Sequence, residues 1–241
     1  MIRRLAFFPS LFAGLLALAA CSAPALSDEA RVVPAPKLDV PLASKPGTQT
    51  AVFAGGCFWG MQWVFEHVKG VTDVTAGYSG GAGDTAYYER VSEGGTGHAE
   101  SVQVRFDPSK VSYGELLRVY FSVAADPTEL NRQGPDIGTQ YRSVIFYADP
   151  QQQRIARAYI AQLTSAKVYA APIVTQVVPF RAFYPAEAYH QDYARLNPDA
   201  PYIAINDAPK VRRFGKVLPA LFRAHPIVHR APSSTIGVRV L

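Results

Sequence analysis

The chain has 241 residues, of which 49% are hydrophobic and 18% charged, so it has enough apolar material for one full-sized core. The formal net charge is +5, but seven basic residues and no acidic one follow Asp207, which leaves the body mildly acidic. A body without clustered basic residues excludes a nucleic-acid-binding surface.

The first residues have the pattern of an export signal. Arg3 and Arg4 precede an apolar run from Leu5 to Ala20, which is too short for a stable membrane span. The run ends in LAAC, which resembles the bacterial lipobox, whose cysteine is diacylated and becomes the first residue of the mature protein. We therefore expect residues 1–20 to be a lipoprotein-type signal peptide and Cys21 to be lipidated. The alternative is an ordinary signal peptide, with Cys21 discarded.

A tether and one folded domain follow the signal. Residues 21–47 are rich in Pro, Ala and Ser and lack periodicity, which predicts a flexible tether. Regular patterns then fill residues 48–207. Apolar alternation and turn residues predict five strands, and apolar residues at helical spacing predict three helices. The strands are expected within residues 48–56, 71–81, 98–108, 141–150 and 173–180, and the helices within 58–68, 112–124 and 150–166.

The order of these elements predicts the fold class. Strands and helices alternate irregularly, which favours an α+β fold, with helices and sheet in two layers. Ser112 is the expected N-cap of the second helix, with Glu115 in the capping-box position. Residues 124–140 and 181–203 show no periodic pattern, and long irregular loops inside a domain are usually functional.

Cys57, in the stretch AGGCFWG, lies at a predicted strand-to-helix turn. Once the signal peptide is processed it is the single free thiol, which excludes an intramolecular disulfide by count. No spacing of Cys and His in the chain is typical of a zinc site, so no metal is expected. The N–H groups and dipole at a helix start would stabilise a thiolate here. The alternative is a buried structural cysteine beside core aromatic residues.

Two chemistries are open for a reactive Cys57. A hydrolase would need a base, for which His98 and His190 are the candidates, although no spacing rule ties either one to Cys57. An oxidoreductase would need a thiolate, a proton donor and a pocket. Glu100 lies at the mouth of a predicted strand, where a buried carboxyl could stay protonated.

Six stretches together resemble one family, the A-type peptide-methionine sulfoxide reductases. They are GGCFWG (55–60), GYSGG (77–81), TGHAE (96–100), FDP (106–108), DIGTQYRS (136–143) and AEAYHQDY (186–193). They follow in the family's order, and the match covers residues 48–207. Together, the pattern and the resemblance predict a two-layer α/β sandwich with a ferredoxin-like core and long irregular loops. The sheet is expected to be mixed and mainly antiparallel.

The resemblance implies roles for individual residues. Cys57 corresponds to the nucleophile that attacks the sulfoxide sulfur, and Glu100 to the acid that protonates the sulfoxide oxygen. The other matched positions are the aromatic cage for the substrate methyl group, the two tyrosines that bind the oxygen and the aspartate that organises the site: Phe58 and Trp59, Tyr88 and Tyr141, and Asp136. The implied reaction reduces methionine S-sulfoxide, free or in proteins, and leaves a Cys57 sulfenic acid. A Cys–His hydrolase and a non-catalytic sulfoxide-binding module are the alternatives.

The chain departs from many family members in one respect. It has no further cysteine near the C-terminus that could attack the sulfenic acid. This predicts a one-cysteine cycle without a cofactor, in which an external thiol, thioredoxin-like or small, reduces Cys57. The expected partners are oxidised proteins, free methionine sulfoxide and that thiol, and we expect a monomer.

The expected location is the bacterial cell envelope. Ser22 is not the aspartate that commonly retains lipoproteins in the inner membrane, so the predicted anchor lies in the outer membrane and the domain faces the periplasm. Residues 208–241 form a basic C-terminal extension. Its charge could attract anionic lipid, or the apolar spacing of Phe214, Val217, Leu218 and Leu221 could place a helix on the domain.

Overall fold

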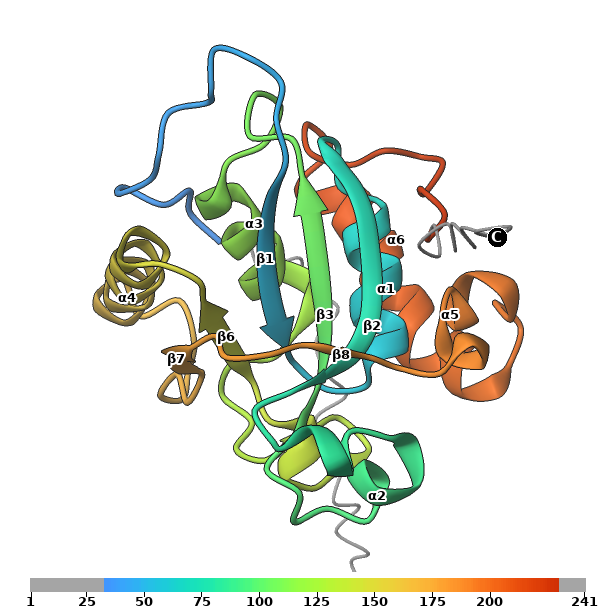
Figure 1. Ribbon diagram of the computed structural model, residues 1–241. Helices are drawn as coiled ribbons and strands as arrows, with labels where there is room; N and C mark the ends of the chain where they lie inside the picture. The colour runs from blue at the N-terminus through green and yellow to red at the C-terminus, as the bar shows by residue number, and fades with distance from the viewer. Residues whose placement is uncertain (1–32, 230–241) are drawn as a thin grey trace, which may run out of the picture.

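A six-stranded sheet forms the centre of the computed structural model, which describes residues 33–229 (Figure 1). The predicted signal peptide and Cys21 lie outside the described residues. The sheet has the order β7-β6-β1-β3-β2-β8, and the pair β6–β7 is parallel whereas the others are antiparallel. Its strands are β1 Gln49–Ala54, β2 Val71–Ser79, β3 Ala99–Phe106, β6 Val144–Tyr147, β7 Gln176–Pro179 and β8 Tyr184–Pro185.

The inner strands have ferredoxin-like topology. Helix α1 (Phe58–Glu66) connects β1 to β2, and α3 (Tyr113–Val119) lies between β3 and β6, so that the strands stand in the order β6-β1-β3-β2. Helix α4 (Pro150–Ser165) then makes the crossover that the parallel pair β6–β7 needs. The predicted α+β class, mixed sheet and ferredoxin-like core are confirmed, and each of the eight predicted elements is present.

Side chains of strand β1 alternate between the two faces of the sheet. Phe53 points into the main core, where its ring stacks on Phe65 of α1 with centroids 5.3 Å apart. Its neighbour Val52 points the opposite way, into a smaller cluster with Phe146 that Phe183 helps to cover. This is the alternation of a pleated strand, and it explains why β1 is buried on both sides.

Local sequence signals set the ends of the helices. At α3 the Ser112 hydroxyl accepts the Glu115 N–H at 3.1 Å, and the Glu115 carboxylate accepts the Ser112 N–H at 3.3 Å. This is the predicted capping box. Helix α1 packs on β2 and β3 through Phe58, Met61 and Phe65, the residues whose helical spacing predicted it.

The predicted flexible tether is wrong for the part that the structure describes. Val33 is fully buried, and the Asp39 carboxylate accepts the Ser112 hydroxyl at 2.5 Å and the Gly114 N–H at 2.9 Å. The Tyr159 hydroxyl donates to the Pro34 carbonyl at 2.6 Å. These partners belong to α3 and α4, so no pattern within the segment could have revealed them.

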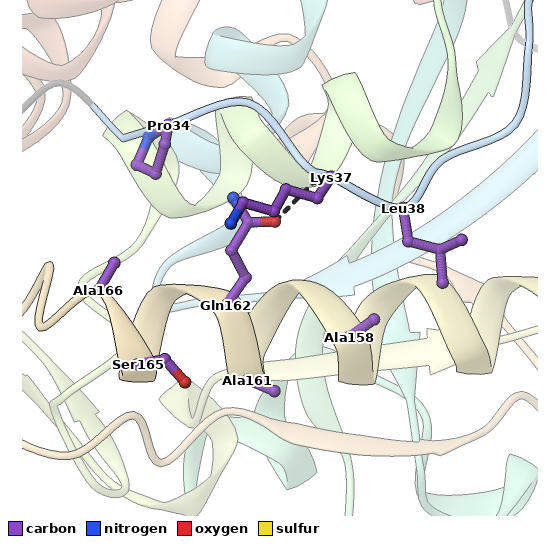
Figure 2. Close-up of a pocket in the computed structure, with 8 residues that line it drawn as sticks. All are labelled: Pro34, Lys37, Leu38, Ala158, Ala161, Gln162, Ser165 and Ala166. Carbon is purple, nitrogen blue, oxygen red and sulfur yellow. Dashed lines mark hydrogen bonds between the residues drawn. The ribbon is translucent and has the colours of Figure 1, made fainter.

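The segment after Val33 runs alongside α4 and leaves an open groove of about 580 Å³ between them (Figure 2). The Lys37 N–H holds the segment to the Gln162 side chain at 2.7 Å, and Pro34 and Leu38 form one wall. Alanines of α4 form the other. Helix α4, and the groove beside it, lie at the β6–β7 end of the sheet. Helix α1 packs on other strands, β2 and β3.

Shorter elements complete the structure. They are the hairpin of β4 Arg132–Gln133 and β5 Asp136–Ile137, helices α2 Tyr88–Ser92, α5 Tyr193–Leu196 and α6 Ala208–Val217, 3₁₀ turns Gly83–Thr85, Thr139–Tyr141 and Ala188–His190, and π-helical turns Tyr120–Ala124 and Ile203–Asp207. Helix α6 packs on α1 and buries Phe214. Of the two alternatives for the C-terminal extension, this is the helix packed on the domain. None of the helices within residues 33–229 is long and apolar enough to cross a membrane.

Candidate active site

A tight turn between β1 and α1 presents Cys57. Gly56 has a φ of +93°, and a Cβ there would lie 2.6 Å from the Gln133 side chain, so the turn requires glycine. Cys57 is the N-cap of α1, as the sequence predicts, and only 8% of it is exposed. The thiol therefore stands at the start of a helix inside the protein.

Glu100, on β3, reaches the same helix start. Its Oε2 accepts the Phe58 N–H at 3.0 Å, and the Cys57 side chain hydrogen-bonds its carboxyl. Only 2% of Glu100 is exposed, and burial raises the pKa of this carboxyl to about 8. Glu100 is therefore mainly protonated at neutral pH, so it can act as an acid beside the sulfur.

The expected stabilisation of a Cys57 thiolate is not what the structure shows. Burial, followed by the charges of Glu100 and Asp207, raises the pKa of Cys57 well above its ordinary value. The Trp59 N–H in the first turn of α1 opposes this but is the smaller effect. The helix start alone would lower the pKa, but desolvation and nearby carboxylates outweigh it, and without substrate the group is a thiol.

Two hydroxyls and one carboxylate share this environment. Burial raises the pKa of Tyr88 and of Tyr141, and the charges of Glu100, Cys57 and Asp136 raise both pKa values further. Tyr88 begins α2, and Tyr141 ends the 3₁₀ turn that follows β5. Both hydroxyls keep their protons at neutral pH and can donate to an acceptor oxygen. The structure thus gathers the predicted site residues around Cys57.

An aromatic wall covers the start of α1. The Trp59 ring stacks on Tyr193 of α5 with centroids 4.0 Å apart, and its indole N–H donates to His190 Nδ1 at 3.1 Å. Phe58 is fully buried, 5.0 Å from the His190 ring and 5.8 Å from Tyr78. Trp59 keeps partial exposure, so it forms the accessible part of the predicted methyl-binding cage.

The two histidines have structural partners. His98 Nδ1 accepts the Gly81 N–H at 3.2 Å, and Nε2 lies 2.8 Å from the Ala82 carbonyl oxygen. Both of its nitrogens are therefore occupied by backbone. His190 uses Nδ1 to accept from Trp59, and burial lowers its pKa. His98 thus has no free nitrogen to act as the base of a Cys–His hydrolase, and burial disfavours the charged form that His190 would take in that role.

Several site residues were not predicted from the sequence. The Tyr202 hydroxyl donates to Asp136 Oδ2 at 2.5 Å, which fixes the carboxylate of the β4–β5 hairpin. Asp207 is completely buried, bonds Lys210 Nζ at 3.2 Å and fills the space that a Cβ at Gly60 would need. The π-helical turn Ile203–Asp207 brings Tyr202 and Asp207 to α1.

Only the amino-acid composition of this region could have pointed to Tyr202 and Asp207. Residues 181–207 are rich in tyrosine and acidic residues but have no period that would tell which side chains face Cys57. As to metal ligands, the structure of residues 33–229 has no group of three or more His, Cys, Asp or Glu side chains placed to hold an ion.

Comparison with known proteins gives one consistent result. The family model described as peptide methionine sulfoxide reductase matches residues 49–219. The chain is 59% identical over 183 residues to peptide methionine sulfoxide reductase MsrA 2 of Mesorhizobium japonicum, covering 76% of this chain and 94% of that protein. It is 53% identical over 191 residues to the MsrA 2 of Synechocystis, covering 78% of this chain and 89% of the relative.

Solved structures agree with the sequence relatives. Methionine sulfoxide reductase A of Corynebacterium diphtheriae superposes with a TM-score of 0.56 at 36% identity, covering 66% of this chain and 80% of that one. Reduced Mxr1 of Saccharomyces cerevisiae gives a TM-score of 0.58 at 29% identity, covering 66% and 94% of the two chains. The chain therefore belongs to the peptide methionine sulfoxide reductase family, and it is an oxidoreductase that reduces methionine sulfoxide with electrons from thiols.

Proposed function

We propose that Cys57 is the nucleophile of this reduction and Glu100 its acid. The observation that carries the proposal is the buried Glu100 carboxyl, which bonds both the Phe58 N–H and the Cys57 side chain and whose pKa is raised to about 8. A neutral carboxyl can donate its proton to a sulfoxide oxygen while the adjacent sulfur attacks. A carboxylate at that place would repel both the oxygen and a developing thiolate.

The proposed step balances without a cofactor. The Cys57 sulfur bonds the substrate sulfur as the sulfoxide oxygen takes the proton of Glu100. The oxygen then passes to Cys57, which becomes a sulfenic acid, while the substrate leaves as a methionine thioether. The sulfenic oxygen keeps one proton, and the proton of the original thiol restores Glu100.

Two surfaces of the site would recognise the methyl sulfoxide group. Tyr88 and Tyr141 supply hydroxyl donors for the oxygen, and Asp136, fixed by Tyr202, holds the hairpin before Tyr141. Trp59 and the buried Phe58 behind it receive the methyl group. We assign selectivity for the S epimer, free or in proteins, on the family resemblance.

The second half of the cycle depends on an external thiol. Cys57 and Cys21 are the two cysteines of the sequence, and Cys21 lies in the predicted lipobox. A first thiol would condense with the sulfenic acid and release water, and a second would displace it as a disulfide and restore Cys57. We propose a thioredoxin-like protein or a small thiol as the donor.

The experiment uses a single turnover without reductant. One equivalent of methionine per enzyme should form, and dimedone should trap Cys57 as the sulfenic acid adduct. Cys57→Ser should form no methionine while keeping the circular dichroism spectrum of the wild type. Methionine from the serine variant would remove Cys57 from the mechanism, and an intramolecular disulfide seen by mass would contradict the one-cysteine cycle.

We further propose that the enzyme repairs oxidised proteins in the cell envelope as a monomer. The support is the signal pattern, the lipobox ending in Cys21 and Ser22 after it. In this proposal a lipid at Cys21 holds the domain at the outer membrane, facing the periplasm. The spacer is shorter than the predicted tether, because the chain already packs on the domain at Val33.

A further inference from the structure

A segment beyond the matched family region is bound along one end of α1. After α6 the chain crosses the turn between α1 and β2, and three backbone hydrogen bonds fix it there. The Lys69 N–H donates to the Leu221 carbonyl at 2.8 Å, the Arg223 N–H to the His67 carbonyl at 2.8 Å, and the Ile227 N–H to the Glu66 carbonyl at 3.1 Å. The family match ends at residue 219, so most of this segment is additional to it.

The described part of the segment ends at His229, which joins two other elements. Its backbone N–H donates to Asp192 Oδ1 at 3.2 Å, and its Nδ1 lies 3.2 Å from Asp73 Oδ1 on β2. Only 11% of the His229 side chain is exposed. Figure 1 shows this segment, in red, running from the end of α6 toward α5.

Asp192 is in the left-handed conformation, which is uncommon for residues other than glycine. It stands before α5 with a φ of 57° and a ψ of 15°, in the left-handed region. Its N–H donates to the Gln62 side chain at 2.9 Å, and its Oδ2 pairs with Arg195 at 3.1 Å. Partners on both sides of the residue therefore fix the direction in which α5 begins.

Tyr193 is the first residue of α5, and its ring stacks on the ring of Trp59. A connected series of contacts thus runs from His229 through Asp192 and Tyr193 to Trp59. The His229 side chain anchors the end of the segment to Asp73, and this anchor places the backbone N–H that Asp192 accepts. Loss of the side-chain contact would let the backbone N–H move away from Asp192 and loosen the Tyr193 ring that stacks on Trp59.

The charged groups around His229 favour the protonated form of its ring. Asp73 and Asp192 face it, and Arg195 neutralises part of their charge. Glu66 lies beside them, but burial and the neighbouring Asp192 carboxylate raise its pKa to about 10, so it is neutral. The hydrogen bond with Asp73 raises the pKa of His229 above its ordinary value. The ionic contact is therefore complete at mildly acidic pH and is lost as the pH rises through that raised value.

We propose that His229 is a positioning residue for substrate binding: its side chain is anchored on Asp73, which places its backbone N–H to fix Asp192 at the start of α5 and so hold Trp59 in place. The inference rests on the proposed role of Trp59 in binding the substrate methyl group. It predicts an effect on KM rather than on the chemical step, because no hydrogen bond among the described residues joins Cys57 or Glu100 to His229, Asp192 or Asp73.

The test measures KM and kcat for methionine sulfoxide in the full chain at pH 6.5. His229→Ala should raise KM roughly threefold to tenfold, the factor for a lost hydrogen bond, and leave kcat within about twofold. His229→Gln, which keeps a donor for Asp73, should bind like the wild type. His225→Gln is the matched control, because His225 is exposed on the same segment.

A second readout does not depend on activity. In a Trp63→Phe background, Trp59 is the remaining tryptophan, and His229→Ala should shift its emission while His225→Gln does not. Unchanged emission and KM in His229→Ala would overturn the inference. Trp59→Ala measured in parallel separates the two proposals, because a KM unchanged in that variant would instead reject the proposed role of Trp59.

The pH profile covers the case in which His229→Ala does not fold. The KM of the wild type should rise above neutral pH relative to that of His229→Gln, which has no titrating group at this position. Superimposable profiles of KM for the two proteins would also overturn the inference.

Discussion

At the scale of single residues, the candidate site contains two acidic groups that burial keeps protonated. Glu100 and Cys57 lie together at the start of α1, and burial is the largest cause of the raised pKa of each. Two adjacent negative charges in a medium of low polarity would be costly. The pair can hold a proton until a sulfoxide oxygen arrives to accept it.

Glu100→Gln tests the acid directly. The amide oxygen can still accept the Phe58 N–H, but the proton donor to the sulfoxide is lost. We expect the rate of single-turnover reduction to fall by about 10²–10⁴, as for lost general acid catalysis, with a much smaller change in KM. Glu89→Gln on the exposed face of α2 is the control. A wild-type rate in Glu100→Gln would reassign Glu100 to a structural role.

The pH dependence follows from the same residue. Because the pKa of Glu100 is about 8, the carboxyl is protonated below that pH and ionised above it. The rate constant for sulfoxide reduction should therefore fall as the pH rises above about 8, and this fall should be absent in Glu100→Gln. A rate that instead rises steadily through this range would show that the thiolate of Cys57, rather than the proton of Glu100, limits the step.

At the scale of elements, α1 and the π-helical turn Ile203–Asp207 form one unit. Asp207 lies directly against the first turn of α1 at Gly60, and Tyr202 reaches Asp136 in the β4–β5 hairpin. A π-helical turn is a known feature of functional sites, since it redirects side chains within a helical segment. The arrangement explains why a glycine is present in α1, where it lowers helix propensity.

Gly60→Ala tests that contact. A Cβ at this position would lie 2.0 Å from Asp207 Oδ1, so the carboxylate or the helix must move. We expect a loss of about 1–3 kcal/mol in the free energy of unfolding, the usual cost of overpacking, and reduced activity. Gly215→Ala in α6 is the control, because its nearest neighbour is a Phe222 ring atom at 3.3 Å. Equal stability of the two variants would show that Asp207 adapts freely.

At the scale of the whole molecule, an additional segment at each end packs on the ferredoxin-like core. The N-terminal one binds α3 and α4 through Asp39 and Pro34, and the C-terminal one binds α1 and α5 through Ile227 and His229. The groove beside α4 belongs to the first of these (Figure 2), and none of the residues that line it is part of the candidate active site. The proposed lipid at Cys21 would thus hold the domain by a short spacer next to α4.

The proposed anchor has a direct test in the producing bacterium. Globomycin, which blocks the lipoprotein signal peptidase, should cause the unprocessed protein to accumulate, and [³H]palmitate should label the wild type. The Cys21→Ala protein should take up no label and be insensitive to globomycin. Identical processing of both proteins, with recovery in the soluble periplasmic fraction, would leave an ordinary signal peptide.

The sequence by itself determined what depends on neighbouring residues. Periodicity predicted the strands and helices of the ferredoxin-like core, and short local motifs predicted the capping box at Ser112 and the position of Cys57 at the start of α1. Each of these follows from side chains within a few positions of one another, where spacing alone specifies the geometry. The ordered motifs likewise led to the family that the comparisons show.

The tertiary structure alone decided what depends on distant partners. The described part of the predicted tether, from Val33 on, packs on the domain because Ser112 and Tyr159 bind it. The pKa of Cys57 is raised because burial and carboxylates from other elements outweigh its helix start. The positions of Asp207 and His229 follow the same rule. Burial and charge at a site are sums over groups far apart in the chain, and no local pattern records them.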